Sequence, residues 1–368
     1  MTPDPRSRGL LARPRLTALI EAGAIAAGRS IEPSQIQPAS LDLRLGAEAY
    51  RLRASFLPGR GAKVRERLAT LSPEPISLTG EGAVLEKGIV YVAPLVERLA
   101  LPETLAGAAN PKSSTGRLDI FVRLIVDGGA AFDEAPAGYE GPLWVEISPR
   151  SFSVRVREGT RLNQLRLREA APRATIADAE LRARHQRVAV VDAALELRDG
   201  LVVHVGLAQS GIVGFRAVKN GSVIDVDRPG AYAAEDFWEP IRAPAGRLIL
   251  DPDEFYILAS RERMHIPADL AAEMAAIDPA LGEFRVHYAG FFDPGFGWTP
   301  SGLPGARAVL EVRGRDVPFM LEDGQPIARL VFEPLAGAAD ALYGAIGGSN
   351  YQGQGLKLAK HFRDWGAA

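Results

Sequence analysis

Apolar and polar residues alternate over short runs along most of this chain. Leu41, Leu43 and Leu45 alternate with Asp42 and Arg44, and this period of two predicts a half-buried strand with the leucines on one face and the charges on the other. Similar short apolar runs, separated by turns rich in Gly and Pro, occupy residues 88–92, 120–126 and 143–147. The second half of the chain has the same texture, so we predict an all-β fold, either a sandwich or a barrel.

Helical periodicity is confined to two places. After Pro14 a helix is predicted that stops at Gly28. The apolar residues with helical spacing there are Leu16, Leu19, Ile20, Ala24 and Ala27. A second helical stretch is predicted at residues 177–186, between the two halves of the chain. Minor helices are therefore expected beside a mostly β structure.

One pattern occurs twice along the chain, and a single constant shift in residue number relates the two occurrences. The related segments are 101–107 (LPETLAG) and 266–272 (IPADLAA), Tyr91 and Tyr256, 143–146 and 308–311, and 157–159 and 322–324. Four pairs in one register indicate a duplication. We interpret the chain as two copies of one β-domain, residues 1–185 and 186–368.

The composition narrows the possible function classes. The net charge of the 368 residues is −2, so affinity for anions has to be local and nucleic acid is not expected as a partner. The chain has no cysteine, which excludes disulfides, thiolate catalysis and cysteine-bound zinc. Its five histidines lack metal-binding spacing. No run approaches the roughly 18 apolar residues of a membrane span, so we expect a cytoplasmic protein without a metal site of its own.

The most unusual stretch is residues 111–117 (PKSSTGR), an island of cations and hydroxyl groups between two apolar regions. Such a turn is suited to binding a phosphate chain; the alternative is a solvated turn whose Ser or Thr caps a short helix. Its counterpart in the second copy, residues 276–282 (AIDPALG), has lost the cations. The second copy ends instead in a Gly-rich tail at residues 343–355, which suggests a division of labour between the copies.

Two glutamates occupy equivalent positions in apolar strands, Glu146 in WVEI and Glu311 in VLEV. Carboxylates are rarely buried unless they are paired or take part in chemistry. Their recurrence favours a functional role for at least one, and the alternative is a strand-edge glutamate in solvent. Asp293 and His287 are further candidates, for which a turn-initiating Asp and a structural His are the alternatives.

Together these motifs resemble one family, the dCTP deaminases of the dUTPase-like superfamily. Residues 111–117 are similar to the family's [GP]-[RK]-S-S-x-x-R motif. The other similar segments are 36–46 (the N-terminal strand motif), 286–295 (the segment that reads the cytosine ring), 309–311 (the strand of the catalytic glutamate) and 348–354 (the lid over the triphosphate). The length and the duplication resemble the fused two-domain form found in bacteria.

The resemblance implies two distorted jelly-roll β-barrels and hydrolytic deamination of dCTP to dUTP and ammonia. It makes Glu311 the general base, with Glu146 as second choice, and gives Ser113 and Arg117 the task of positioning the attacking water. Partial burial is expected to raise the pKa of the base above its usual value of about 4.3. The implied substrate-binding residues are Lys112, Ser114, Ala289, Asp293, Tyr343, Tyr351, Gln352 and Gln354.

The resemblance also implies ligands and partners. They are dCTP and dUTP, Mg²⁺ bound through the substrate triphosphate, dTTP as an inhibitor that the family would allow, and further copies of the chain in a dimer or trimer. Residues 112–117 would form half of a site, with Glu311 and the tail as the other half, in one chain or in adjacent chains. The family's lid lysine is replaced by Asn350, so one phosphate contact is weakened or is supplied by Lys357.

Two other functions stay open at this point. The first is nucleotide hydrolysis, by a dUTPase or by a bifunctional deaminase that also releases pyrophosphate, since the same superfamily contains both. The second is a β-barrel oligomer that binds nucleotides without turnover, which a degenerate duplication can produce.

Overall fold

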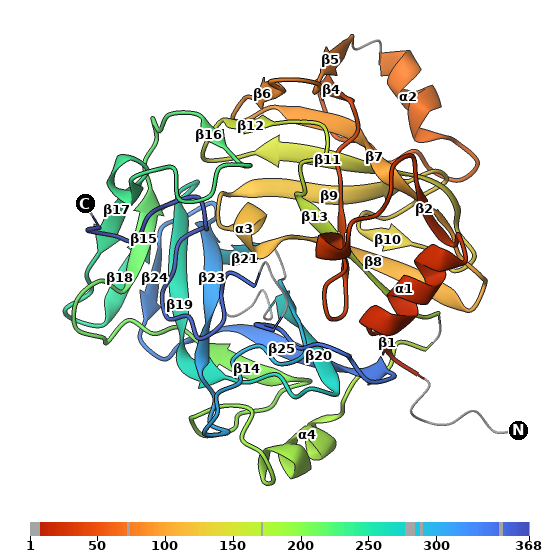
Figure 1. Cartoon of the computed structure of the whole chain (residues 1–368). Helices are drawn as coiled ribbons and strands as arrows, with labels where there is room; N and C mark the ends of the chain where they lie inside the picture. Colours follow the sequence, from red (N-terminus) through yellow and green to blue (C-terminus); the bar gives the residue numbers. More distant parts are fainter. Residues whose placement is uncertain are drawn as a thin grey trace, which may run out of the picture. The chain divides into compact units, whose positions relative to one another are not determined.

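The structure is a computed structural model that describes residues 8–71, 74–170, 172–276, 284–287, 290–345 and 349–367. Strands dominate these residues, and the predicted all-β class is confirmed (Figure 1). The chain forms two compact units. The first contains Met1–Ala174, Gly221–Pro229 and Leu335–Asp340, and the second contains Thr175–Asn220, Gly230–Pro334 and Ala341–Ala368. Among the described residues no helix is long and apolar enough to cross a membrane.

The first unit is built mainly from three groups of paired strands. One is β5 (Pro75–Ser77), β4 (Glu48–Leu52), β7 (Val90–Ala100), β11 (Glu140–Pro149) and β9 (Ile120–Val126), with β2 (Ile25–Ala27) also on β7. Another is β10 (Glu134–Ala135), β8 (Leu105–Pro111), β13 (Asn163–Glu169) and β1 (Leu10–Leu11), with β3 (Leu41–Leu43) also on β13. The third is β16 (Ile224–Asp225), β12 (Val154–Val156) and β6 (Ala83–Leu85). The helices are α1 (Arg13–Glu21), η2 (Pro33–Gln35), α2 (Val64–Leu71) and α3 (Ser113–Gly116).

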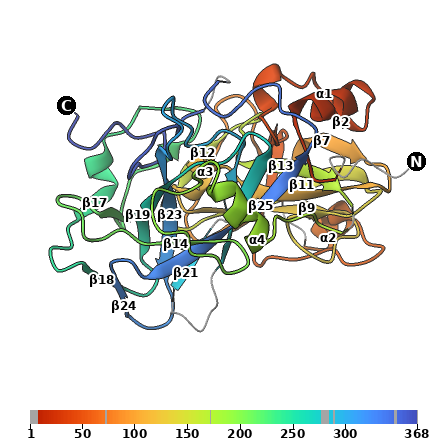
Figure 2. The same cartoon turned by 90° about the horizontal axis from the view of Figure 1, so that it is seen from below.

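The second unit repeats this arrangement. Its first group is β17 (Trp238–Ile241), β15 (Gly214–Ala217), β19 (Phe255–Met264), β23 (Ala306–Gly314) and β21 (Phe284–His287). Its second is β14 (Leu201–His204), β25 (Pro326–Ala336), β20 (Leu270–Ala276) and β22 (Phe291–Phe292), and its third is β18 (Arg247–Leu250) with β24 (Phe319–Glu322). The helices are α4 (Asp178–His185) and η3 (Ala234–Asp236). In both views α4 lies beside β14 (Figures 1 and 2), where Gly200 N donates to Asp178 Oδ1 at 2.8 Å.

The duplication is confirmed at the level of single hydrogen bonds. Tyr91 on β7 accepts a hydrogen bond at its hydroxyl from Glu86 N, at 3.0 Å. At the equivalent place in the second unit, the hydroxyl of Tyr256 on β19 accepts one from Asp251 N, at 2.9 Å. The strand registers follow the same shift, since β11 pairs with β7 as β23 pairs with β19.

Two segments of the second sequence copy fold as part of the first unit. Gly221–Pro229 contributes β16, which pairs in parallel with β12, and Arg157 donates to both carboxylate oxygens of Asp225 at 2.8 and 2.7 Å. Leu335–Asp340 includes the end of β25, which pairs with β1. The units divide between Ala174 and Thr175, so the predicted helix at 177–186, which is α4, belongs to the second unit.

The N-terminal helix is shorter than its periodicity predicts. The predicted stop at Gly28 is wrong, because α1 ends at Glu21 and Gly23 ends the helical path with φ +76°. Gly23 N donates to Ile20 O and Ala24 N to Leu19 O, which is the hydrogen-bond pattern of a left-handed C-terminal cap. The apolar residues beyond it are in the turn and in β2.

The charged face predicted for the strand around Leu41–Leu43 is also different from expectation. Asp42 and Arg44 are 2% and 5% exposed, so both faces of this strand are covered. Arg44 Nε lies 2.7 Å from Glu97 Oε1, and Gln35 Nε2 donates to the same oxygen at 3.0 Å. These partners make the burial of charge tolerable, and they come from distant parts of the chain.

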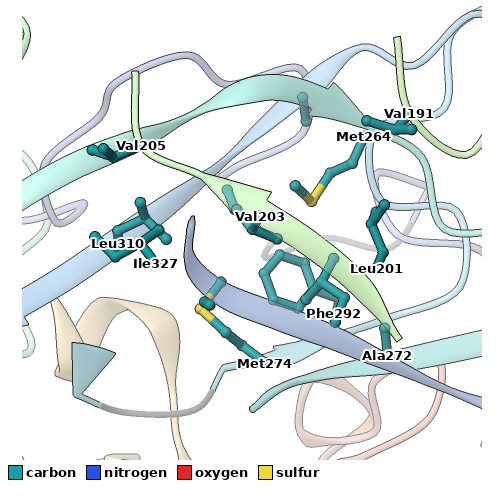
Figure 3. Close-up of a cluster of buried hydrophobic side chains, with 14 of the residues drawn as sticks. Val191, Leu201, Val203, Val205, Met264, Ala272, Met274, Phe292, Leu310 and Ile327 are labelled. Atoms are coloured by element: carbon teal, nitrogen blue, oxygen red, sulfur yellow. The ribbon is translucent and has the colours of Figure 1, made fainter. Parts of the chain in front are cut away.

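The core of the second unit surrounds the strand that carries Glu311 (Figure 3). Leu310 and Val312 on β23 belong to this apolar cluster, together with residues of β14, β20 and β25. Because side chains alternate along a strand, Glu311 projects from the opposite face of the sheet to Leu310. The core thus fixes which way the glutamate points.

Candidate functional site

The motif of residues 111–117 forms a tight turn between β8 and β9. Lys112 is the N-cap of α3, and its carbonyl accepts hydrogen bonds from Thr115 N at 2.8 Å and Gly116 N at 2.9 Å. No side chain caps this helix, so the alternative in which a hydroxyl serves as the cap is not what the structure shows. Ser114 and Arg117 are 7% and 3% exposed, while Ser113 is half-buried.

The cation of Lys112 has an acidic partner within the first unit. Its ammonium group forms an ion pair with Asp42 Oδ2. Asp42 is 2% exposed, and its Oδ1 has no hydrogen-bond partner among the described residues. Lys112 therefore neutralises a buried carboxylate, whatever else it binds.

A second carboxylate supports the exit of the turn, and sequence reasoning missed it. The backbone of Asp119 has φ +55°. Its carboxylate accepts a hydrogen bond from Ser151 Oγ at 2.6 Å, and its carbonyl accepts one from Arg150 N at 2.9 Å. Asp tolerates this left-handed backbone better than most residues. In the sequence, the feature that could have indicated this backbone conformation is a single Asp directly before the apolar run of Ile120–Val126.

Glu146 is held in a buried ion pair. Arg123 on β9 donates to Glu146 Oε1 from Nε at 3.0 Å and from Nη2 at 2.5 Å. The guanidinium carbon lies 3.6 Å from the ring centre of Phe132 and 4.7 Å from that of Phe121, so the cation is packed between aromatic faces. Glu146 itself is 1% exposed. This pairing gives the second-choice base a structural role.

Glu311 occupies the equivalent place in the second unit with different neighbours. Its backbone pairs with Ile257 on β19 and with His287 on β21, as Glu146 pairs with Val92 and Arg123. The side chain is 7% exposed. His287 thus takes the strand position of Arg123, and the constant shift that holds elsewhere fails by one residue next to this glutamate.

Asp293 begins a turn at the end of β22 and is 8% exposed. Phe296 N donates to its carbonyl at 3.1 Å, and Gly295 follows with φ +86°. A Cβ at Gly295 would lie 2.7 Å from Leu342 Cβ. The Asp-Pro-Gly turn is therefore fitted closely against the beginning of the C-terminal tail, where Tyr343 N donates to Pro294 O at 2.8 Å.

The tail is docked onto this turn and onto β23. Gln352 accepts from Gly297 N at 2.9 Å and donates to Gly295 O at 3.0 Å. Gln354, which is 6% exposed, donates to Arg307 O at 2.9 Å. These contacts bring two predicted substrate-binding residues together at the start of the strand of Glu311.

The two tyrosines of the tail have packing roles. Tyr343 lies against Phe296, with ring centres 5.6 Å apart, and its hydroxyl accepts a hydrogen bond from Tyr351 N at 3.2 Å. Tyr351 is 5% exposed within the apolar core, and its hydroxyl accepts one from Lys360 N at 3.2 Å. Both rings thus anchor the tail. Ala289, predicted to hold the cytosine ring, lies outside the described residues.

A protein-held metal centre has no ligand set in the described part of the chain, where no three His, Asp or Glu residues lie close enough to share an ion.

The fold and the two groups of residues define the class of protein. Over 89% of this chain the structure superposes on 99% of the crystal structure of 2'-deoxycytidine 5'-triphosphate deaminase from Agrobacterium tumefaciens, with a TM-score of 0.86 and 47% sequence identity. The architecture is therefore that of a two-domain nucleotide deaminase.

Two family models match the sequence and cover most of it. Residues 7–171 match the 2'-deoxycytidine 5'-triphosphate deaminase (DCD) N-terminal domain, and residues 177–362 match the C-terminal domain. The chain belongs to this deaminase family.

Curated relatives match over shorter stretches. The dCTP deaminase of Haloarcula marismortui is 31% identical over 136 residues, which are 37% of this chain and 67% of the relative. The "dCTP deaminase, dUMP-forming" of Halobacterium salinarum is 33% identical over 129 residues, which are 34% of this chain and 62% of the relative. The matches to these relatives thus span about two thirds of their length.

Proposed function

We propose that this chain hydrolyses dCTP to dUTP and ammonia, with Glu311 as the general base. Membership of the deaminase family supports the reaction. The observation that carries the choice of base is the ion pair of Glu146 with Arg123. Two hydrogen bonds from the half-buried Arg123 hold one carboxylate oxygen of Glu146 in a structural contact.

The chemistry requires three proton movements. The water molecule that attacks C4 of the cytosine ring loses one proton, the ring nitrogen N3 gains a proton, and the proton left on the new C4 hydroxyl is transferred to the amino group, which leaves as ammonia. Glu311 takes the proton of the attacking water and passes it on to the ring. Its strand position, 7% exposed, holds the carboxylate in one place on a rigid sheet.

The remaining site residues have supporting roles in this proposal. Ser113 and Arg117 orient the water, and Lys112 and Ser114 bind phosphate oxygens. Asp293 contacts the substrate at the turn before β23. The backbone of Ala289 holds the ring, and the lid over the triphosphate is formed and anchored by Tyr343, Tyr351, Gln352 and Gln354.

The metal ion, the oligomer, the cellular compartment and an inhibitor are proposed on the same basis. Mg²⁺ neutralises the triphosphate when it is bound and is held through the substrate. Further copies of the chain assemble into a homo-oligomer, and the absence of cysteine fits a reducing cytoplasm. dTTP is a candidate inhibitor because it resembles the product in its ring and triphosphate.

The decisive test is incubation of the protein with dCTP and Mg²⁺, followed by separation of the nucleotides and an ammonia assay. We expect dUTP and one ammonia per turnover. Glu311→Gln should lower kcat by about 10²- to 10⁴-fold, the usual contribution of a general base, while Glu146→Gln should stay within about 3-fold of wild type. Loss of activity in Glu146→Gln with a folded protein and normal activity in Glu311→Gln would show that the base is misassigned.

A second product is the specific alternative, because several of the similar curated relatives are named dUMP-forming. The same incubation distinguishes the two. Pyrophosphate and dUMP in equal amounts from the first turnover would replace dUTP as the product. If dCTP were unchanged after prolonged incubation, the remaining candidate function would be nucleotide binding without turnover.

A further inference from the structure

The second unit contains a cavity of about 620 Å³ that none of the proposed roles uses. Its wall includes Arg184 at the end of α4, Arg187 just after this helix, the loop before β20 with His265, and Trp298 with Leu342. Cavities of this size accept a nucleotide-sized or smaller organic molecule. The chemistry of the wall indicates which kind.

The wall carries three charged residues, Arg184, Arg187 and Asp269. Arg184 is committed to acidic neighbours, with Nη1 at 2.7 Å from Asp269 Oδ2 and Nε at 3.0 Å from Glu180 Oε1. Arg187 is exposed and donates through Nε to Ala183 O at 3.3 Å. Among the described residues it forms no ion pair. Its guanidinium is thus the cation at this cavity that can receive an anion.

The apolar part of the wall is unusually exposed. Trp298 is 50% exposed and Val188 is 49% exposed, and both line this cavity. A large aromatic surface in water is unfavourable by about 25 cal/mol for each Å². A planar ring lying on the indole would cover that surface and stack with it.

A neutral polar group completes the wall. His265 is 6% exposed, and burial lowers the pKa of its imidazole, against the opposing effect of a backbone hydrogen bond with Ala189. The ring is therefore uncharged at neutral pH. It offers a hydrogen-bonding group without adding a second positive charge.

We propose that this cavity binds a small aromatic anion, whose planar ring lies on Trp298 and whose phosphate, sulfonate or carboxylate group pairs with Arg187. The wall is also part of the turn to which the tail is docked. Gln352 Nε2 donates to Gly295 O at 3.0 Å and to Trp298 O at 3.4 Å, and Leu342 precedes Tyr343. A ligand here changes how firmly the tail is held, which makes the cavity a regulatory site; this second step rests on the proposed function.

The probe for binding is 1-naphthyl phosphate, added to the full chain while tryptophan fluorescence and heat of binding are recorded. We expect saturable binding and quenching of Trp298. Arg187→Gln should weaken the binding about 10-fold or more, as loss of a charge-assisted contact does, and Trp298→Leu should weaken it and remove the quenching. Arg182→Gln on α4, five residues before Arg187, is the matched control, because Arg182 is exposed and does not line the cavity.

Three outcomes would overturn the proposal. Equal binding by wild type and Arg187→Gln places the probe elsewhere, and inorganic phosphate binding as tightly as the probe removes the role of the ring. The third outcome combines two results: the probe does not bind, and light scattering gives a lower molar mass for Trp298→Leu than for wild type. Together they would identify the exposed indole as a contact between copies of the chain.

Regulation is tested separately, by measuring the KM for dCTP with and without the probe. We expect a change of about 3-fold or more in wild type and none in Arg187→Gln. A change that persists in Arg187→Gln means competition at the nucleotide site and contradicts the coupling. If the protein did not deaminate dCTP at all, the fluorescence and calorimetry would still decide the binding site, so the two proposals fail independently.

Discussion

Arg123 donates two hydrogen bonds to a single carboxylate oxygen of Glu146, from Nε at 3.0 Å and from Nη2 at 2.5 Å. In the second unit the strand position of Arg123 is taken by His287, which pairs through its backbone with Glu311. One change of neighbour therefore separates two glutamates that the sequence presents as equivalent. In the first unit the carboxylate is a structural anchor, and in the second it is the proposed base.

The first prediction concerns the stability of this ion pair. Arg123→Met should lower the free energy of unfolding by about 3–5 kcal/mol, because it leaves the carboxylate of Glu146 buried without its cation. Adding Glu146→Gln should recover part of this loss. Urea denaturation of the wild type and of both variants measures these changes, and a double variant no more stable than Arg123→Met would contradict the explanation.

The second prediction separates two roles of Lys112. Its ion pair with the buried Asp42 implies that Lys112→Met loses up to about 3 kcal/mol of stability, in addition to raising the KM for dCTP. The double variant with Asp42→Asn should regain stability and keep the high KM. If the KM returned to normal with the stability, Lys112 would have no contact with phosphate.

The third prediction concerns the segment Gly221–Pro229. Asp225 receives two hydrogen bonds from Arg157, which lower the pKa of its carboxyl. Asp225→Asn should cost about 1–3 kcal/mol and make this segment more sensitive to proteolysis. Because the pKa is lowered on folding, the contribution is present above about pH 4 and is lost as the pH falls. Glu81→Gln is the control, since Glu81 faces the same arginine at 3.9 Å but is 95% exposed.

The fourth prediction is a pH dependence from His265. Burial lowers the pKa of its imidazole in the folded protein, so below about pH 6.5 the unfolded chain binds a proton that the folded chain does not. Stability should fall with decreasing pH in this range, by at most about 1.4 kcal/mol per pH unit from this residue. Urea midpoints between pH 8 and 5 test it, and His265→Gln should show a smaller slope than wild type.

The fifth prediction tests whether Lys357 supplies the phosphate contact expected of the family's lid lysine. Asn350 and Lys357 line one cavity of about 410 Å³ in the C-terminal tail. Lys357→Met should raise the KM for dCTP about 5- to 10-fold with kcat within about 2-fold, as loss of a phosphate contact would. Asn350→Lys should restore the KM in that background. An unchanged KM in steady-state kinetics would show that Lys357 makes no contact with the triphosphate. Lys219→Met is the control, because the side chain of Lys219 is 78% exposed.

Local patterns predicted much of the architecture. Short apolar runs between turns identified strands such as β9, and the helical stretch at 177–186 is α4. The constant shift between the copies is preserved down to the hydrogen bonds of Tyr91 and Tyr256. These features can be predicted from the sequence because the periods of strands and helices depend on neighbouring residues, and a duplication appears as regularly spaced similar residues.

The all-β class, the duplication and the residues that could take part in a deamination were thus predictable from the order of residues alone. Only the tertiary structure decided their surroundings: Asp42 and Arg44 are covered on a strand that alternation predicted to be half in solvent, Glu146 is paired with Arg123, and Gln352 ties the tail to the turn at Gly295. The physical reason is that burial and electrostatic partners depend on segments far apart along the chain. A one-residue slip in strand pairing is enough to give Glu311 a different neighbour from Glu146.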